Sequence, residues 1–396
     1  MVGRTTWALA LALLLVSCID VSTGADDAAD STTVETGPGR LVILDGSGDV
    51  VVIDPDGANR ASVTDDASSR FVYTQPVWSP DGSRIAWGQI GDGGFAVGIQ
   101  YPGSEEPTLV ETTNLPFYTF WSPDGASLGV LHNGDAGVDF RIVDVERGTS
   151  ITADSDTPYY FSWSPDGERV VAHAGENRFE TITTGGDHDA LEPTSPSYLA
   201  PQWTPDGIFH VVDDQLVMDD GQGSRVPMAQ VSGLTTFVAN PQGTRVAIQT
   251  TADGSGIAVA LGAIPTVAPG NVMILDVETG TIERASQGLS AGFFWSRDGE
   301  SLLILQPGST GIVPRVWDVS GTSVDYVEYR PPSTIVRDTL PFFPQYAQSV
   351  EFWAPDSSAF AFAGEIDGEQ GIWVQELSAD RPTLVSDGIW VDWSSG

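Results

Sequence analysis

The chain has 396 residues with a formal net charge of −37, from 54 acidic side chains against 17 basic ones, all of them Arg. This charge excludes nucleic acid as a partner, because binding to phosphates needs a basic surface, and it favours a soluble monomer. The absence of Lys excludes lysine-based covalent mechanisms, and the single Cys, Cys18, excludes internal disulfides.

The first 17 residues have the pattern of a secretory signal peptide. Residues 1–4 carry a positive charge, and residues 7–16 form an apolar run that is too short to span a bilayer as a mature helix. Cys18 follows Leu15-Val-Ser, and this end of the run resembles a bacterial lipobox. The resemblance implies cleavage before Cys18 and attachment of a lipid to its sulfur. The alternative is an ordinary secreted protein in which Cys18 stands at the end of the leader by chance.

Residues 18–39 are predicted to form the lipidated Cys and an acidic, disordered linker, because the segment is polar and poor in apolar side chains. A flexible linker of this length would hold the following domain roughly 25 Å from a membrane. The remaining residues, 40–396, are predicted to form one β domain, since helical periodicity is nearly absent and the 44 Gly and 26 Pro indicate many turns.

A five-residue pattern recurs about every 40 residues in this domain. Residues 78–82, 121–125 and 163–167 read Trp-Ser-Pro-Asp-Gly, and residues 203–207 read Trp-Thr-Pro-Asp-Gly. Weaker copies stand at residues 239–243 (Ala-Asn-Pro-Gln-Gly), 295–299 (Trp-Ser-Arg-Asp-Gly), 353–357 (Trp-Ala-Pro-Asp-Ser) and, truncated, 393–396. Self-similarity at this period in a strand-rich chain is typical of a β-propeller.

Each copy of the pattern predicts a hairpin. Ser, Pro, Asp and Gly fill the four positions of a type I turn in their preferred order. An aromatic strand precedes the turn, an apolar strand follows it, and two further strand candidates complete a four-stranded blade. The Trp is therefore interpreted as a wedge between adjacent blades and the Asp as a turn residue. The alternative, a ring of ligand-stacking Trp, would not explain why the turn is repeated with it.

Eight copies predict an all-β propeller of eight four-stranded blades; seven is the alternative, because the two longest units could hide a miscounted boundary. The last copy leaves no room for outer strands, whereas residues 40–64 contain strands that precede the first copy. We therefore expect residues 389–393 to supply the inner strand of a blade whose outer strands come from residues 40–64, which removes a free sheet edge. The extra length at about 252–270 and 329–348 is predicted to form loop insertions.

These copies resemble the WD40-like repeat of the TolB propeller family, over residues 40–396. The resemblance implies a TolB-like β-propeller and says little about activity. Relatives of this kind include propellers that bind partner proteins in the cell envelope, propeller domains of prolyl-oligopeptidase-like enzymes, and lyases that act on oligosaccharides.

The residue types of catalytic and metal sites are scarce. The Gly-x-Ser-x-Gly pattern occurs at residues 125–129 and 288–292, but both copies lie within the repeated β units and lack the strand-turn-helix context of a nucleophile elbow. Three of the four His, namely His132, His173 and His210, fall in the second strand of successive repeats at different offsets, so they are expected at the surface or at strand ends rather than on a metal; the fourth is His188. Two Asp-Gly-Ser-Gly segments, at residues 45–48 and 253–256, faintly resemble calcium loops, but hairpin turns explain both. No cofactor is predicted, with calcium as the alternative.

Aromatic residues gather where the chain enters the inner strands, which places them at one mouth of the central channel. The candidate ligand-contact residues are Tyr73, Tyr118, Tyr159, Tyr160, Tyr198, Tyr346 and Trp390. Tyr159, Tyr198 and Tyr346 are expected to be exposed, whereas the alternative is that most of these rings pack between blades.

The sequence thus predicts a non-enzymatic binding or scaffold module, anchored by lipid to the extracytoplasmic face of a bacterial membrane, that engages an envelope protein or glycan. The alternative is a carbohydrate lyase or hydrolase that uses Asp, Glu, Tyr or His in the channel. A deep channel with paired carboxylates and His or Arg would favour the enzyme, and a shallow aromatic-rimmed face would favour binding.

Overall fold

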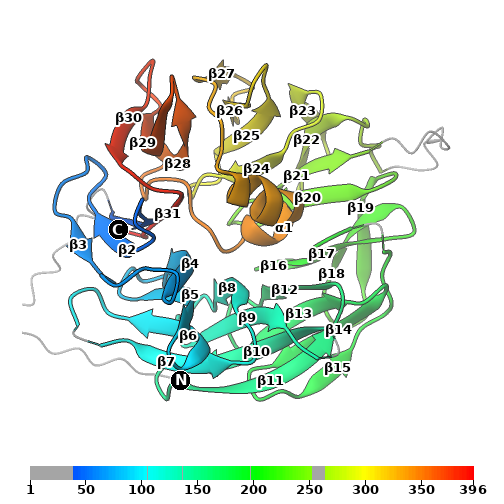
Figure 1. Ribbon diagram of the computed structural model, residues 1–396. Helices are drawn as coiled ribbons and strands as arrows, with labels where there is room; N and C mark the ends of the chain where they lie inside the picture. Colours follow the sequence, from blue (N-terminus) through cyan, green and yellow to red (C-terminus); the bar gives the residue numbers. More distant parts are fainter. Residues whose placement is uncertain (1–38, 105, 136, 197, 252–263) are drawn as a thin grey trace, which may run out of the picture. The chain divides into compact units, whose positions relative to one another are not determined.

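Eight β-sheets surround a common centre (Figure 1). Within each sheet, neighbouring strands are hydrogen-bonded in order from the innermost to the outermost. The computed structural model describes residues 39–104, 106–135, 137–196, 198–251 and 264–396. Seven of the sheets have four antiparallel strands, and the eighth has three. In this eighth sheet Trp353 takes the innermost position through an isolated bridge to Phe360. The prediction of eight blades is therefore confirmed.

The strands of successive blades occupy equivalent positions. The innermost strands are β31 (Trp390–Trp393), β4 (Val72–Trp78), β8 (Pro116–Trp121), β12 (Tyr159–Trp163), β16 (Gln202–Thr204), β20 (Thr235–Ala239) and β24 (Gly292–Trp295). The second strands are β1 (Leu41–Leu44), β5 (Ile85–Gly91), β9 (Ser127–Asn133), β13 (Arg169–Ala174), β17 (Gly207–Val212), β21 (Arg245–Thr250), β25 (Ser301–Pro307) and β28 (Ala359–Ile366).

The two outer positions complete each blade. The third strands are β2 (Val50–Ile53), β6 (Gly94–Gln100), β10 (Val138–Asp144), β14 (Arg178–Thr183), β18 (Gln215–Asp219), β22 (Asn271–Asp276), β26 (Ile312–Asp318) and β29 (Glu369–Glu376). The outermost strands are β3 (Ala61–Ser62), β7 (Thr108–Thr112), β11 (Thr149–Asp156), β15 (His188–Ala190), β19 (Arg225–Gln230), β23 (Ile282–Gln287), β27 (Ser323–Asp325) and β30 (Thr383–Ser386).

The ring closes by joining distant parts of the chain, as the sequence predicted. Strand β31 pairs with β1 in antiparallel register from Leu41 opposite Trp393 to Leu44 opposite Trp390. The sheet order β3-β2-β1-β31 gives this blade three strands from residues 41–62 and one from the last part of the chain. Its second and third strands are entirely buried, so the closure also completes a hydrophobic core.

The repeated turns have the predicted chemistry. In the first three copies the Ser hydroxyl donates to the Asp carboxylate at 2.5–2.6 Å, and the Gly N–H donates to the Ser carbonyl at 2.8–2.9 Å. Gly82 and Gly125 have φ near +67° and +68°, a left-handed conformation in which a side chain is strained. Ser357 adopts the same conformation, at φ +59°, in the copy that lacks Gly.

The anchor Trp residues connect neighbouring blades, which confirms that they fill the wedges. Trp163, Trp295 and Trp353 each donate their indole N–H to a carbonyl of the preceding blade, and these acceptors are Phe120, Val238 and Phe294 at 2.9–3.1 Å. Each acceptor immediately precedes the anchor of its own blade. The Trp is therefore repeated because it serves blade packing.

The blades are numbered in chain order from the closing blade, so that blade 1 contains β31 and β1–β3, blade 3 contains β8–β11, blade 4 contains β12–β15 and blade 7 contains β24–β27. The insertion after blade 7 is folded and does not form the predicted loop. It contains the π-helical turn η1 (Ile335–Thr339), the 3-10 turn η2 (Leu340–Phe342) and the short helix α1 (Phe343–Tyr346). All four residues of α1 are buried, and the helix lies at the centre of the ring of blades (Figure 1). Apolar side chains such as Phe343 and Tyr346 drive this placement, since burial removes them from water. The other predicted insertion, 252–270, lies largely outside the described residues.

Candidate functional site

A cavity of about 500 Å³ occupies the centre of the propeller. Its walls come from the innermost strands β4, β8, β12, β16, β20, β24 and β31, and its rim includes a proline from each of five consecutive turns. These rim prolines are exposed: Pro80, Pro123, Pro165, Pro205 and Pro241. The cavity therefore opens on the face that carries the repeated turns.

The opposite end of the central space is closed by α1 and the residues that follow it. Gln345 is buried, and its side-chain amide bonds both backbone groups of Phe161, accepting from the N–H at 2.9 Å and donating to the carbonyl at 2.7 Å. Tyr118 donates to the backbone carbonyl of Gln345 at 3.0 Å. Residues 347–351 then line the cavity itself. The side-chain amide of Gln345 thus provides hydrogen-bond partners for the backbone at the inner edge of β12, as a neighbouring strand would.

Three charged side chains line the cavity together: Arg297, Glu351 and Asp392. Arg297 Nε lies 3.2 Å from Glu351 Oε2, and Arg297 also donates from Nη2 to the Trp393 carbonyl at 3.2 Å. The side chain of Arg297 is 26% exposed and that of Glu351 is 30% exposed, whereas Asp392 is buried. The turn after β24, the end of the insertion and strand β31 position these three groups.

The two carboxyl groups are held largely by backbone donors. Asp392 accepts from the Trp78 N–H at 2.8 Å and from the Glu351 N–H at 2.6 Å, and Glu351 accepts from the Trp353 N–H at 3.1 Å. Burial raises the pKa of Asp392 to about 8, against the lowering effect of these N–H donors. Burial also raises the pKa of Glu351, although the Arg297 charge opposes the shift. Both carboxyl groups therefore keep their protons to a higher pH than exposed carboxyl groups do.

The seven candidate ligand-contact residues do not form an exposed aromatic mouth. All seven candidates, Tyr73, Tyr118, Tyr159, Tyr160, Tyr198, Tyr346 and Trp390, are between 1% and 8% exposed. The prediction that Tyr159, Tyr198 and Tyr346 are exposed is wrong. The rings of Tyr159 and Tyr198 stack on Phe140 and His173 of the blades, and Tyr346, at the end of α1, packs against Tyr118. Tyr118 and Tyr346 pack edge to face with ring centroids 5.0 Å apart, and Tyr346 donates to the Phe117 carbonyl at 2.9 Å.

The histidines of the second strands are also buried. Of the two expected positions, the surface is wrong, whereas His132 and His173 do lie next to the last residue of β9 and β13. His132, His173 and His210 are at most 2% exposed. His173 stacks on Tyr198 with centroids 4.4 Å apart, and burial lowers the pKa of both His173 and His210. Within the described residues, no group of three or more His, Cys, Asp or Glu side chains could hold a metal ion.

The first calcium-like segment is a turn held by its own residues. The Asp45 carboxylate accepts from the backbone N–H groups of Ser47 and Asp49 at 2.9 and 3.0 Å, and it forms an ion pair with Arg60. The second segment, at residues 253–256, lies outside the described residues.

The signal peptide, Cys18 and the acidic linker lie outside the described residues, which begin at residue 39. In the described part of the chain no helix has the length and apolar character needed to cross a membrane.

The sequence analysis named the anchor Trp residues that line the cavity but missed the charged residues there, although one signal was visible. Arg297 replaces the Pro of the repeated turn in Trp-Ser-Arg-Asp-Gly, and this departure from the pattern brings a cation into the cavity. Glu351 and Asp392 belong to no motif. Only the closure of the ring and the path of the insertion bring them to Arg297.

Comparisons with known proteins agree with the fold. No family model matches the chain. A segment of 66 residues is 38% identical to the Tol-Pal system protein TolB of Gluconobacter oxydans, which covers 16% of this chain and only 14% of that protein. Among solved structures, a eukaryotic initiation factor aligns with a TM-score of 0.55 and 13% identity over 90% of this chain and 98% of its own.

An oligogalacturonate lyase in complex with manganese aligns with a TM-score of 0.53 and 13% identity, over 86% of this chain and 98% of its own. At such low identity these structures establish a shared architecture alone, and the functions in their names differ. The repeats, the eight blades and these similarities identify the fold as a β-propeller, and one segment of 66 residues is similar to TolB.

Proposed function

We propose that the chain is a binding or scaffold module of the cell envelope, which takes up part of a protein or glycan through the open mouth of the central cavity. One observation carries the proposal: a cavity of about 500 Å³, open on the face of the turns, brings Arg297 and Glu351 together among aromatic and proline side chains. A largely apolar pocket with a few convergent polar groups is the usual form of a ligand site.

The proposed location is the extracytoplasmic face of a bacterial membrane, with the lipid on Cys18 as the anchor. The basic start, the short apolar run and the lipobox-like residues before Cys18 support this location. A Cys18→Ser variant is expected to leave the membrane fraction on cell fractionation. Continued membrane association of the variant would contradict the anchor.

The binding role can be tested with a matched pair of arginine variants. Arg297 and Arg315 have side chains of equal exposure, 26%, and each forms an ion pair, with Glu351 and Asp325 respectively. Arg315 lies on β26, away from the cavity lining. In a pulldown from an envelope extract, Arg297→Gln should reduce recovery of the partner at least ~10-fold, the factor that 1.4 kcal/mol represents. Arg315→Gln should recover it normally.

Equal recovery by wild type and Arg297→Gln would refute the cavity as the binding site. Circular dichroism and gel filtration of both variants serve as the folding control, since each loses one ion pair.

An enzyme acting on carbohydrate is the second candidate, because the cavity does contain two carboxyl groups and an arginine. Asp392, however, uses both carboxylate oxygens on backbone N–H groups, which favours a structural role for it. Incubation of the purified protein with envelope oligosaccharides, followed by mass spectrometry, separates the two candidates. Release of shortened products by wild type but not by Glu351→Gln would replace the binding proposal with the enzymatic one.

A further inference from the structure

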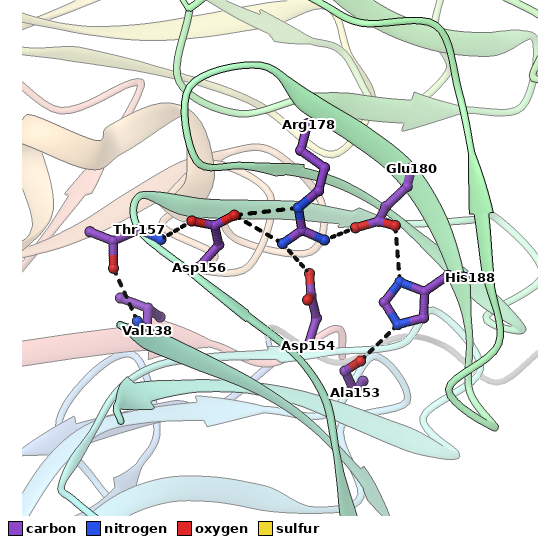
Figure 2. A network of polar contacts seen from close by, with 8 residues as sticks. All are labelled: Val138, Ala153, Asp154, Asp156, Thr157, Arg178, Glu180 and His188. Carbon is purple, nitrogen blue, oxygen red and sulfur yellow. Dashed lines mark hydrogen bonds and ion pairs between the residues drawn. The ribbon is translucent and has the colours of Figure 1, made fainter. Parts of the chain in front are cut away.

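The outer edges of blades 3 and 4 are joined by a polar network that lies away from the cavity. Strand β11 of blade 3 supplies Asp154 and Asp156, whereas β14 and β15 of blade 4 supply Arg178, Glu180 and His188 (Figure 2). Figure 2 shows these side chains converging between the two blades, with Arg178 at one end of the carboxylate Glu180 and His188 at the other.

Arg178 is the centre of the ionic part of this network. Its Nη2 lies 2.8 Å from Asp154 and 3.2 Å from Asp156, and its Nη1 pairs with Glu180. One guanidinium therefore faces three carboxylates, and a net negative charge remains in the network. This excess charge favours a second cation nearby.

His188 occupies the place of that second cation. Its Nδ1 lies 2.9 Å from Glu180 Oε2, and its Nε2 lies 2.9 Å from the backbone carbonyl of Ala153 on β11. Both partners are acceptors only. A neutral imidazole can donate from one nitrogen, so it would leave one of these contacts without a proton; the imidazolium donates from both.

We propose that His188 is a pH-dependent staple between blades 3 and 4, which holds β15 against β11 while the imidazole is protonated and releases Ala153 when it is neutral. The geometry of the two acceptors carries the proposal, and it is independent of the cavity and of the proposed function. The charged groups that act on the ring are Glu180 from β14 and Asp154 from β11, and Arg178 joins both of them to Asp156 further from the ring (Figure 2).

The electrostatic surroundings agree with this assignment. The hydrogen bond to Glu180 raises the pKa of His188 above its usual value, with further contributions from the Ala153 carbonyl and the Asp154 charge and against the effect of burial. Because the folded pKa is raised, the stabilisation is fully present below about pH 6.5, the ordinary value for His. It is lost as the pH rises through the folded pKa.

The protonation state can be measured on the full-length protein by ¹⁵N NMR of the imidazole nitrogens, since the chain has four histidines and the other three are buried. We expect the midpoint of the His188 titration to lie above pH 6.5, and both ring nitrogens to be protonated at pH values below that midpoint. Glu180→Gln should move the midpoint downward. A wild-type midpoint at or below 6.5 would overturn the proposal.

The mechanical role requires a second measurement. Hydrogen exchange of the β11 and β15 amides, corrected for intrinsic pH dependence, should show protection that declines through the His188 midpoint. His188→Gln should lose this decline, whereas Asp189→Asn, an exposed neighbour on β15 that is outside the network, should keep it. An unchanged decline in His188→Gln would also overturn the proposal.

Discussion

Gln345 provides the sharpest test of how the insertion is held in the propeller. Replacing it with Ala leaves the N–H and carbonyl of Phe161 without partners in a buried position. Tyr118 keeps its bond to the backbone carbonyl of residue 345. Each orphaned buried group costs about 1–3 kcal/mol. We expect a loss of about 3 kcal/mol, since water from the cavity can replace part of the amide.

Urea unfolding followed by tryptophan fluorescence measures this loss, and hydrogen exchange of the Phe161 amide reports it locally. The matched control is Gln348→Ala on the same segment. Gln348 is half-buried and donates only to carbonyls, those of Pro201 and Pro344 at 3.2 and 3.1 Å, so its removal should cost about 1 kcal/mol or less. A loss below about 0.5 kcal/mol for Gln345→Ala, with unchanged exchange at Phe161, would refute the reasoning.

Three further predictions concern the repeats and the cavity. In urea unfolding, Trp163→Phe should destabilise the fold by about 1–3 kcal/mol more than Trp121→Phe. Of these two residues, Trp163 has a carbonyl acceptor for its indole N–H and Trp121 has none. Equal losses would contradict this prediction. Ser357→Gly should raise the urea midpoint by relieving a φ of +59°, a gain of about 1 kcal/mol, whereas Gly125→Ser should lower it. The raised pKa of Asp392 means that, between about pH 4 and 8, the folded state holds a proton that the unfolded state has released. Stability should therefore fall as the pH rises through this range, and Asp392→Asn should flatten the dependence; an unchanged slope would show that Asp392 is ionised when folded.

The sequence predicted the elements whose causes are local. The Ser-Pro-Asp-Gly turns form because neighbouring residues satisfy one another, as Ser122 and Asp124 do at 2.6 Å. The spacing of these turns predicted eight blades, and the leftover strands at both ends of the domain predicted the pairing of β31 with β1. The interpretation of the Trp as blade packing followed from its repetition with the turn and is confirmed by the bond from Trp163 to Phe120.

The candidate site could not be predicted in the same way. An aromatic residue at the start of an inner strand is exposed if that end of the central channel is open and buried if it is filled. Which of the two holds depends on what occupies the centre of the ring. The insertion occupies it. Its Pro content indicated a loop, and the apolar segment that contains Phe343 and Tyr346 is too short to predict a helix. Burial of Tyr159, Tyr198 and Tyr346 followed from packing that no local pattern encodes.

The sequence by itself thus determined the propeller and the number of its blades, because each turn and most strand pairs are specified within one repeat. It also determined how the ring closes, because the strands left over at the two ends of the domain complete one blade. The tertiary structure alone decided which face is open and which charged residues line the cavity. Gln345 meets Phe161 across 184 residues, and Arg297 meets Glu351 only once the ring has closed. Such contacts depend on the packing of distant segments, which the repeated pattern leaves unspecified.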